Sequence, residues 1–346
     1  MMKKDAFLPR RKDDHLRINL ERDVQSDIST GFELLRLKSD PCQRLDSSRV
    51  DTSLLLFGKV LSAPILISSM TGGTPEGTAF NRRLALAAEH CGIAMGVGSQ
   101  RIAIEDPELA PSFNIREFAP TALLFANLGA VQLNYGYGIE ECQKAVDMLQ
   151  ADALYLHLNP HQEALQPEGD HDSSGLIPKI AELCRLLTVP VLVKEVGWGI
   201  DLHTAQQLLE AGVAGIDVSG AGGTSWAKVE MHRLSEAGLS LPDEFFLDAG
   251  IPTASNLYEY RKLSGNPLII ASGGLQNGSD LAKSLALGAR LGGFARKFLL
   301  AANLGELELI REIETISYEL RAEMAACGVP SLKDWNIEFL EGLERL

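Results

Sequence analysis

The sequence predicts an α/β protein with a TIM (β/α)8 barrel that follows an N-terminal extension. Eight short β-rich runs alternate with amphipathic helices from about residue 64 onward, and eight parallel strands are the number that closes such a barrel. Three of the helices end alike, at Gly92, Gly212 and Gly288, where a glycine supplies the left-handed stop before the next strand. Both observations indicate a repeated β/α unit.

The predicted strands are, in chain order, PILISS (64–69), IAMGVGS (93–99), ALLFANLG (122–129), ALYLHLN (153–159), VLVKEVG (191–197), GIDVSG (215–220), LIIASGG (268–274) and RLGGFA (290–295). Between them apolar residues recur at helical spacing, as at Ile139, Cys142, Val146 and Leu149. A doubly wound open sheet is the competing architecture, but no G-x-G-x-x-G follows the first strand, as a dinucleotide fold would require. The barrel is therefore favoured.

We expect one domain over residues 1–346, with the extension at 1–60 and the barrel at 61–346. Residues 51–60 predict a hairpin that plugs the barrel floor, and residues 221–252 form a loop long enough to be a functional lid or an assembly surface. From Ala302 onward, apolar residues at helical spacing predict the eighth helix, namely Leu304, Leu307, Ile310, Ile313, Leu320 and Met324.

Charge and cysteine usage exclude several classes of partner. A formal net charge of −14 over 346 residues argues against a nucleic-acid or anionic-membrane surface, since nothing supplies a broad basic patch. The five cysteines include no C-x-x-C, no apolar run approaches a membrane span, and M-M-K-K-D lacks a signal-peptide core, so a cytoplasmic protein with reduced thiols is expected. An anionic substrate would need a local cationic island.

The segment R-R-K-D-D-H (10–15) is the candidate for that island, with Arg11, Lys12 and His15 close together in an acidic protein. A charge run of this kind is usually only a solvated face. If it folds over the barrel mouth, it would meet an anionic substrate there.

Polar residues that follow the strands are the candidates for chemistry, because barrel active sites lie at the carboxyl ends of the strands. Three glycine-rich elements, A-G-G-T (221–224), S-G-G-L-Q-N-G (272–278) and G-G-F-A (292–295), suit a phosphate, since glycines let backbone N–H groups converge on an anion. Any one of them is equally well explained as a turn. Three on adjacent strands favour a phosphate-bearing cofactor.

Lys194 and Glu195 end the fifth predicted strand, and one of the two should point into the barrel mouth. An internal Lys–Glu pair, a Schiff-base lysine and a lysine that contacts a cofactor remain open on the sequence alone.

The stretch Y-L-H-L-N-P-H-Q-E (155–163) ends in a cluster of polar side chains. Two histidines four residues apart suggest zinc, but Pro160 breaks the helix that would place His157 and His161 on one face. The hard carboxylate of Glu163 suits Mg²⁺ better, because that ion keeps most of its waters and takes one or two protein oxygens. A solvated glutamate and a core histidine are the alternative.

The motifs together resemble a known family, the FMN-dependent type 2 isopentenyl-diphosphate isomerases, over nearly the whole chain. The motifs that carry the resemblance are R-K-D-D-H (11–15), S-M-T-G-G (69–73), M-G-V-G-S-Q-R (95–101), A-N-L-G (126–129), H-L-N-P-H-Q-E (157–163), V-K-E-V-G (193–197), D-V-S-G-A-G-G-T-S-W (217–226) and G-G-L-Q-N-G-S-D-L-A-K-S-L-A-L-G-A (273–289).

The resemblance implies a barrel that binds FMN and Mg²⁺ and interconverts isopentenyl and dimethylallyl diphosphate, with NADPH needed only to reduce the flavin. The implied FMN contacts are Ser69, Met70, Thr71, Ser99, Asn127, Lys194, Ser219, Thr224, Gly274, Leu275, Gln276, Ala295 and Arg296. The implied substrate contacts are Arg11, Lys12, His15, Ser99, Gln100, Arg101, His157, Asn159 and Gln162. Glu163 would hold Mg²⁺, and the extension would contribute to the substrate site.

An amide is too weak an acid to protonate an alkene alone, so the resemblance implies that N5 of reduced FMN is the acid and base. Gln162 would then orient the reacting groups or relay the proton, and His161 has no assigned role. The resemblance also implies a symmetric tetramer or octamer.

Two positions depart from the family pattern, which commonly has an arginine where this chain has Gln276 and a small or amide residue at Arg296. We hypothesise that Arg296 replaces the missing cation, in which case Arg296→Ala weakens FMN retention more than Gln276→Ala. Equal effects would reject the hypothesis.

Two other functions compete with the isomerase. A 2-hydroxy-acid oxidase of the same barrel type would share the flavin loops, but such enzymes resemble one another in a late His-Gly-x-Arg segment where this chain has S-G-G-L (272–275). The second is a phosphate-binding barrel without catalysis, which a colourless purified protein would favour.

Overall fold

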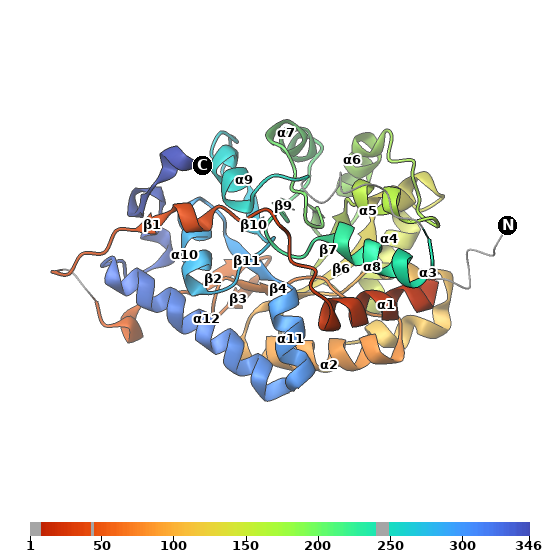
Figure 1. The fold of residues 1–346 in the computed structure, drawn as a ribbon, viewed down its shortest axis with the longest axis horizontal. Coiled ribbons are helices and arrows are strands. Elements are labelled where there is room, and N and C mark those ends of the chain that lie inside the picture. Colours follow the sequence, from red (N-terminus) through yellow and green to blue (C-terminus); the bar gives the residue numbers. More distant parts are fainter. Residues whose placement is uncertain (1–7, 43–44, 240–248) are drawn as a thin grey trace.

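The predicted barrel is confirmed. The computed structural model of the chain describes residues 8–42, 45–239 and 249–346, and its centre is a closed barrel of eight parallel strands in the order β10-β11-β4-β5-β6-β7-β8-β9 (Figure 1). The strands are β4 (Ile65–Ile67), β5 (Ala94–Gly96), β6 (Leu124–Gly129), β7 (Ala153–His157), β8 (Val191–Lys194), β9 (Gly215–Asp217), β10 (Leu268–Ala271) and β11 (Leu291–Phe294). Each lies within one of the eight predicted runs.

Helices surround the barrel, and the predicted glycine stops are confirmed at Gly92, Gly212 and Gly288, whose φ angles are +64°, +93° and +107°. A left-handed residue of this kind ends a helix and turns the chain back to the next strand. The helices after β4 are α2 (Pro75–Cys91), α3 (Arg101–Glu105), α4 (Ile139–Leu149), α5 (Pro160–Leu165), α6 (Leu176–Leu186), α7 (Leu202–Glu210), α8 (Trp226–Glu236), α9 (Thr253–Tyr260), α10 (Gly278–Ala286), α11 (Arg296–Leu304) and α12 (Glu306–Ala326).

The hairpin predicted at 51–60 closes the barrel floor. Its strands β2 (Leu54–Leu56) and β3 (Lys59–Leu61) pair antiparallel. Leu56 and Leu61 are buried in one apolar cluster with Leu66, Phe125 and Tyr155 from inside the barrel. Burial of this apolar surface seals the floor and leaves the carboxyl ends of the strands as the open end of the barrel.

The rest of the extension packs against the helices around the barrel. Helix α1 (Leu8–Glu21) contacts α8, α11 and α2, and Figure 1 shows it lying between α8 and α2. Strand β1 (Arg36–Leu37) pairs with β12 (Leu340–Glu341) near the other end of the chain. The remaining short turns of 3-10 helix are Phe32–Leu34, Ser47–Arg49, Pro107–Phe113, Ala130–Asn134, Leu332–Asp334, Ile337–Phe339 and Leu343–Arg345.

The prediction of a single helix from Ala302 onward is wrong about where that helix begins. Gly305, with a φ of +154°, separates α11 from α12, so Leu304 and Leu307 stand on either side of the break and are 77% and 63% exposed. The later members of the pattern, Ile310, Ile313, Leu320 and Met324, are buried as predicted. α12 is therefore the eighth outer helix, and α11 is an additional short helix at the carboxyl end of β11.

The long segment at 221–252 contains α8, and a bridge between Ala221 and Pro252 closes its base. Residues 240–248 of the predicted lid or assembly surface lie outside the described residues. Within the described ranges, no helix is long and apolar enough to cross a membrane.

Candidate active site

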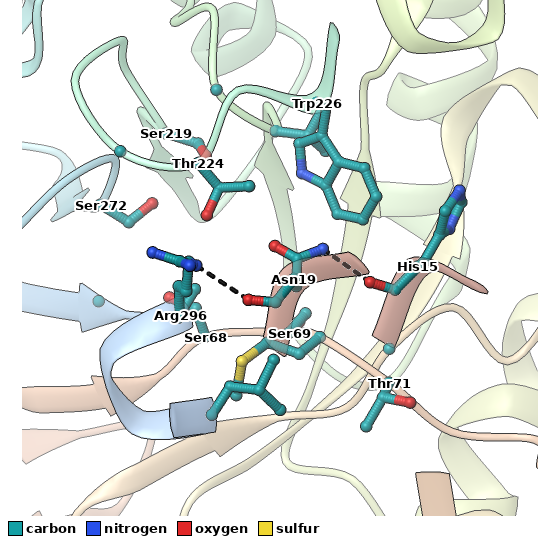
Figure 2. Close-up of a pocket in the computed structure, with 18 of the residues that line it drawn as sticks. His15, Asn19, Ser68, Ser69, Thr71, Ser219, Thr224, Trp226, Ser272 and Arg296 are labelled. Atoms are coloured by element: carbon teal, nitrogen blue, oxygen red, sulfur yellow. Dashed lines mark hydrogen bonds between the residues drawn. The ribbon is translucent and has the colours of Figure 1, made fainter. Parts of the chain in front are cut away.

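The open end of the barrel holds a cavity of about 770 Å³, which is within the usual range for a cofactor site (Figure 2). It brings together residues from the carboxyl ends of all eight strands and from α1. Of the residues predicted for the FMN, substrate and metal sites, all but Gln100 line it. Residues as far apart as Arg11 and Arg296 therefore share one cavity.

Lys194 points into this cavity, whereas Glu195 points away from it. The Lys194 ammonium donates to the main-chain oxygen of Glu195 at 2.6 Å. One carboxylate oxygen of Glu195 accepts backbone N–H groups from residues 196, 197, 198 and 199 at 2.7, 2.7, 2.6 and 3.2 Å. Glu195 therefore fixes the loop after β8, and burial raises its pKa to about 7 against the effect of these donors.

Burial lowers the pKa of Lys194, and the nearby carboxylate of Asp217 opposes that shift. Asp217 is fully buried and accepts a hydrogen bond from Ser272. Lys194 therefore stands on the cavity wall near a buried carboxyl group, which is an arrangement suited to an electron-rich ring system.

His157, Asn127 and Gln100 form a chain of polar contacts at the ends of β5, β6 and β7. Nδ1 of His157 lies 2.8 Å from Oδ1 of Asn127, whose Nδ2 donates to the Val97 oxygen at 3.0 Å. Burial and the charge of Lys194 lower the pKa of His157 to about 3, so the ring is neutral near pH 7.

Gln100, predicted as a substrate contact, is fully buried and does not line the cavity. Its amide donates to the Ala145 oxygen at 2.8 Å and accepts the Asn127 N–H at 2.9 Å. Its geometry suits support of Asn127, one step behind the cavity wall.

The glycine-rich loops approach one another too closely for side chains. A Cβ on Gly223 would lie 2.6 Å from the Gly274 nitrogen, and one on Gly274, where φ is +92°, would lie 2.4 Å from the Gly222 oxygen. α11 begins at residue 296, and its first residue lines the same cavity as these loops, so the unpaired N–H groups of its first turn are available to an anion there. This cradle suits a phosphate group.

Other features of the cavity fit FMN as well. The buried hydroxyl oxygens of Ser68 and Ser69 lack a hydrogen-bond partner among the described residues, although both side chains line the cavity. Buried hydroxyls of this kind ordinarily have partners, so a polar ligand is expected there. The phosphate cradle at one rim and Lys194 on the cavity wall suit the phosphate and the ring of a flavin nucleotide.

The charged segment of α1 folds over the cavity mouth, which favours the cationic island over a solvated face. Arg11 donates to Oε1 of Gln166 at 2.8 Å, and the Lys12 ammonium donates to the oxygens of Gly72 and Ser99 at 2.7 and 2.8 Å. Burial and the charge of Arg11 lower the pKa of Lys12 to about 7.

Glu230 on α8 is a site residue that the sequence did not indicate. Its fully buried carboxylate lies 2.8 Å from Nε2 of His15 and accepts from Gln162 at 3.1 Å, from Gln166, and from Arg233 at 2.8 Å. His15 and Arg233 hold its pKa well below the usual range despite burial. Glu230 thus ties α1, α5 and α8 together, and nothing short of the fold brings residues 15, 162 and 230 into contact.

The stretch at 155–163 supplies α5, which begins at Pro160 with Asn159 before it. Asn159 Nδ2 donates to Gln162 Oε1 at 3.2 Å and to Glu163 Oε1 at 2.9 Å, and the Asp170 N–H donates to Glu163 at 2.7 Å. Arg101 pairs with Asp170 at 2.5 Å. Glu163 therefore presents a buried carboxylate on the cavity wall.

The His161 ring stacks on Trp198 with centroids 5.1 Å apart, outside the cavity lining. Among the described residues there is no group of three or more His, Cys, Asp or Glu side chains placed to hold a metal. The carboxylate and amide oxygens around Glu163 are hard donors, which is the set that Mg²⁺ accepts when waters and a phosphate complete its shell.

Comparisons with known proteins identify the family. The model of the FMN-dependent dehydrogenase family matches residues 143–341. The chain is 49% identical to an isopentenyl-diphosphate delta-isomerase of Nostoc sp. over 93% of this chain and 92% of the relative. Identities to relatives of the same name are 50% in Synechococcus sp., over 92% and 91%, and 45% in Rickettsia akari, over 94% and 95%.

Solved structures support the fold. A structure of flavocytochrome b2 superimposes with a TM-score of 0.69 at 19% identity, covering 100% of this chain and 88% of that one. An (S)-mandelate dehydrogenase superimposes with a TM-score of 0.66 at 17% identity, covering 98% and 96%. The barrel fold is thus shared with these structures, and by sequence the chain belongs to the isopentenyl-diphosphate delta-isomerase family.

Proposed function

We propose that the protein interconverts isopentenyl and dimethylallyl diphosphate, with FMN across the barrel mouth and the diphosphate beneath α1. The observation that carries the proposal is one cavity that joins a phosphate cradle, Lys194 and the cationic segment of α1. The identity of 45–50% to relatives named for this activity supports it. When bound in its reduced form, FMN supplies at N5 an atom able to give and take a proton.

The cations at the mouth are assigned to the substrate diphosphate. Arg11, Lys12 and Arg101 come from two different elements and line one side of the cavity. Neutral His157 and Asn159 add hydrogen bonds without adding charge. Arginine pairs with phosphate oxygens in a forked geometry, so these contacts orient the substrate as well as bind it. The α1 helix above them keeps water from the allylic diphosphate, which is a good leaving group.

Gln162 is assigned to the reacting alkene. Its amide nitrogen is held by Glu230 and its oxygen by Asn159, so the side chain has one fixed orientation on the cavity wall. A double-bond shift adds a proton to one carbon and removes one from another, with cationic character between them. A fixed amide dipole near that carbon orients the alkene and stabilises the developing charge.

Mg²⁺ is assigned to Glu163, with waters and the substrate diphosphate as its other ligands. Glu163→Gln is expected to lower the apparent affinity for Mg²⁺ at least about tenfold, because it removes the anionic ligand. Raising Mg²⁺ in a steady-state assay should restore part of the activity. Full wild-type activity in a chelator would reject the metal assignment.

The pKa of Lys12 predicts a pH dependence. In the free enzyme its value of about 7 lies below the usual 10.5, so between these pH values the folded protein has lost a proton that the unfolded chain keeps. Its contribution to the free energy of unfolding therefore rises with pH in this window. Binding of the diphosphate needs the protonated amine, so kcat/KM should fall about tenfold per pH unit above about 7.

Lys12→Arg provides the matched control, because a guanidinium keeps its charge throughout this range. Its kcat/KM should decline less steeply above pH 7 than that of the wild type. An unchanged decline in the arginine variant would show that another group titrates.

Reduction by NADPH, a cytoplasmic location and a homotetramer or homo-octamer belong to the same proposal. The sequence resemblance supports the NADPH and the homo-oligomer, and a cysteine pattern typical of reduced thiols supports the location. Light scattering of the purified protein measures the assembly directly.

The assay that tests the proposed function measures conversion of isopentenyl diphosphate under anaerobic conditions with FMN, Mg²⁺ and NADPH. Omission of any one should abolish or strongly reduce turnover. Oxidation of a 2-hydroxy acid without isomerisation would favour the oxidase alternative, and a colourless, inactive protein would favour a phosphate-binding barrel without catalysis.

A further inference from the structure

Arg296 stands between the phosphate cradle and helix α1. It is the first residue of α11, next to the glycine-rich loops, and it lines the cavity. Its Nε donates to the Asn19 oxygen at 2.9 Å and its Nη2 donates to the Arg22 oxygen at 3.0 Å. Figure 2 shows the guanidinium pointing toward the main chain of Asn19.

The two carbonyls that accept from Arg296 lie at the carboxyl-terminal end of α1. The last carbonyls of a helix have no partner within it and carry partial negative charge, so a forked cation satisfies and stabilises them. Asn19 continues the contact, since its Nδ2 donates to the His15 oxygen at 2.9 Å. The two hydrogen bonds from Arg296 form a clamp on α1. This is the helix that presents Arg11, Lys12 and His15 to the cavity.

Arg11, His15 and Asn19 lie on one face of α1. They are four residues apart, so they recur about once per turn and span about 12 Å along the helix axis. Arg296 thus holds one end of a short rigid rod, and the residues assigned to the substrate diphosphate lie toward its other end. A shift of the clamped end moves all of them together.

A second set of contacts joins the extension to the cradle. Gln25 donates to the Gly222 oxygen at 2.7 Å, and the Ser26 N–H donates to the Gly223 oxygen at 2.8 Å. Thr30 packs against the cradle so closely that a Cβ on Gly222 or Gly274 would meet it at 2.5 Å. The loops that would hold a phosphate are therefore backed by the chain that follows α1.

We propose that Arg296 is a positioning residue that couples occupancy of the phosphate cradle to the placement of α1. A phosphate in the cradle attracts the guanidinium and holds the glycine-rich loops in place. The guanidinium and the loops in turn hold α1, and with it the substrate contacts, in position. Because coupling between two sites is reciprocal, a docked α1 also favours the phosphate. This inference rests on the proposed function for the identity of the two ligands.

Hydrogen exchange of the full-length protein, followed by mass spectrometry over residues 8–21, tests the coupling. Saturating FMN should slow exchange in this segment at least tenfold, whereas saturating riboflavin, which lacks the phosphate, should slow it less than threefold. Equal protection by riboflavin would overturn the proposal, because the isoalloxazine ring alone would then order the helix.

Arg296→Ala should lose most of the FMN-dependent protection at an FMN concentration that saturates the variant by flavin absorbance. Lys297→Ala is the matched control, since it removes the neighbouring cation of α11, which pairs with Glu312 instead of α1. This control should keep the tenfold protection. Full protection in Arg296→Ala with bound FMN would overturn the proposal.

Arg296→Lys separates charge from geometry. An ammonium keeps the charge but lacks the rigid fork that reaches both carbonyls, so it should retain FMN better than alanine and still leave α1 unprotected. Protection equal to that of arginine would overturn the hydrogen-bonded clamp. In the isomerase assay Arg296→Ala should raise KM about tenfold and change kcat less than threefold.

The exchange measurement needs bound FMN but no turnover. Coupling in a protein without isomerase activity would reject the proposed function and support this inference. Isomerase activity without the coupling would support the proposed function and reject this inference.

Discussion

Gln162→Ala is expected to lower kcat about 100- to 1,000-fold while FMN stays bound, because loss of one preorganised dipole at a developing charge has effects of this size. The side chain is buried and held at both ends by Glu230 and Asn159, so alanine removes an oriented group from the cavity wall. Steady-state isomerase kinetics and flavin absorbance measure the two quantities separately.

Gln166→Ala is the matched control for this prediction. It removes a second amide that donates to the same Glu230 carboxylate, but its oxygen holds Arg11. We therefore expect it to raise KM more than it lowers kcat. A kcat for Gln162→Ala within threefold of the wild type would contradict the assignment of Gln162 to the reacting alkene.

Glu230→Ala is expected to destabilise the protein by about 3–5 kcal/mol, since removing one partner of a buried ion pair leaves the others uncompensated. His15, Gln162, Gln166 and Arg233 would all lose their common acceptor. The free energy of unfolding, measured in denaturant, checks the magnitude. Glu236→Ala on the same helix removes more exposed pairs with Arg17 and Arg22 and should lose no more than about 1 kcal/mol.

The stabilisation by Glu230 also has a predicted pH dependence. Its folded pKa is depressed, so its contribution is complete above the usual carboxyl pKa of about 4.3 and is lost as pH falls further. The difference in stability between wild type and Glu230→Ala should therefore shrink in acid. A difference that stays constant down to pH 3 would show that Glu230 contributes through packing alone.

The barrel was predictable because its strands and helix stops are local features. Each strand is a short apolar run, and Gly92, Gly212 and Gly288 mark chain reversals by backbone conformation alone. The helix break at Gly305 was missed because apolar spacing continues across it, and only the fold exposes Leu304 and Leu307. A glycine between two good helical segments does not by itself show that the helix ends there.

The cavity lining was predictable from motifs at strand ends, whereas the contacts behind it were not. Gln100 sits at the end of its strand like the residues that line the cavity, but its side chain turns toward Ala145. Glu230 contacts His15 across 215 positions of sequence, and Arg296 contacts Asn19 across 277. Such pairs have no local signal, because only the tertiary fold brings their elements together.

The proposed isomerase moves protons without net electron transfer, and the amount of product formed per reduced flavin tests this most directly. The FMN-loaded enzyme is reduced once, excess reductant is removed, and isopentenyl diphosphate with Mg²⁺ is supplied without NADPH under anaerobic conditions. We expect many equivalents of dimethylallyl diphosphate per flavin, with the flavin still reduced at the end. One equivalent or less, with the flavin oxidised, would contradict the account and point to an oxidoreductase.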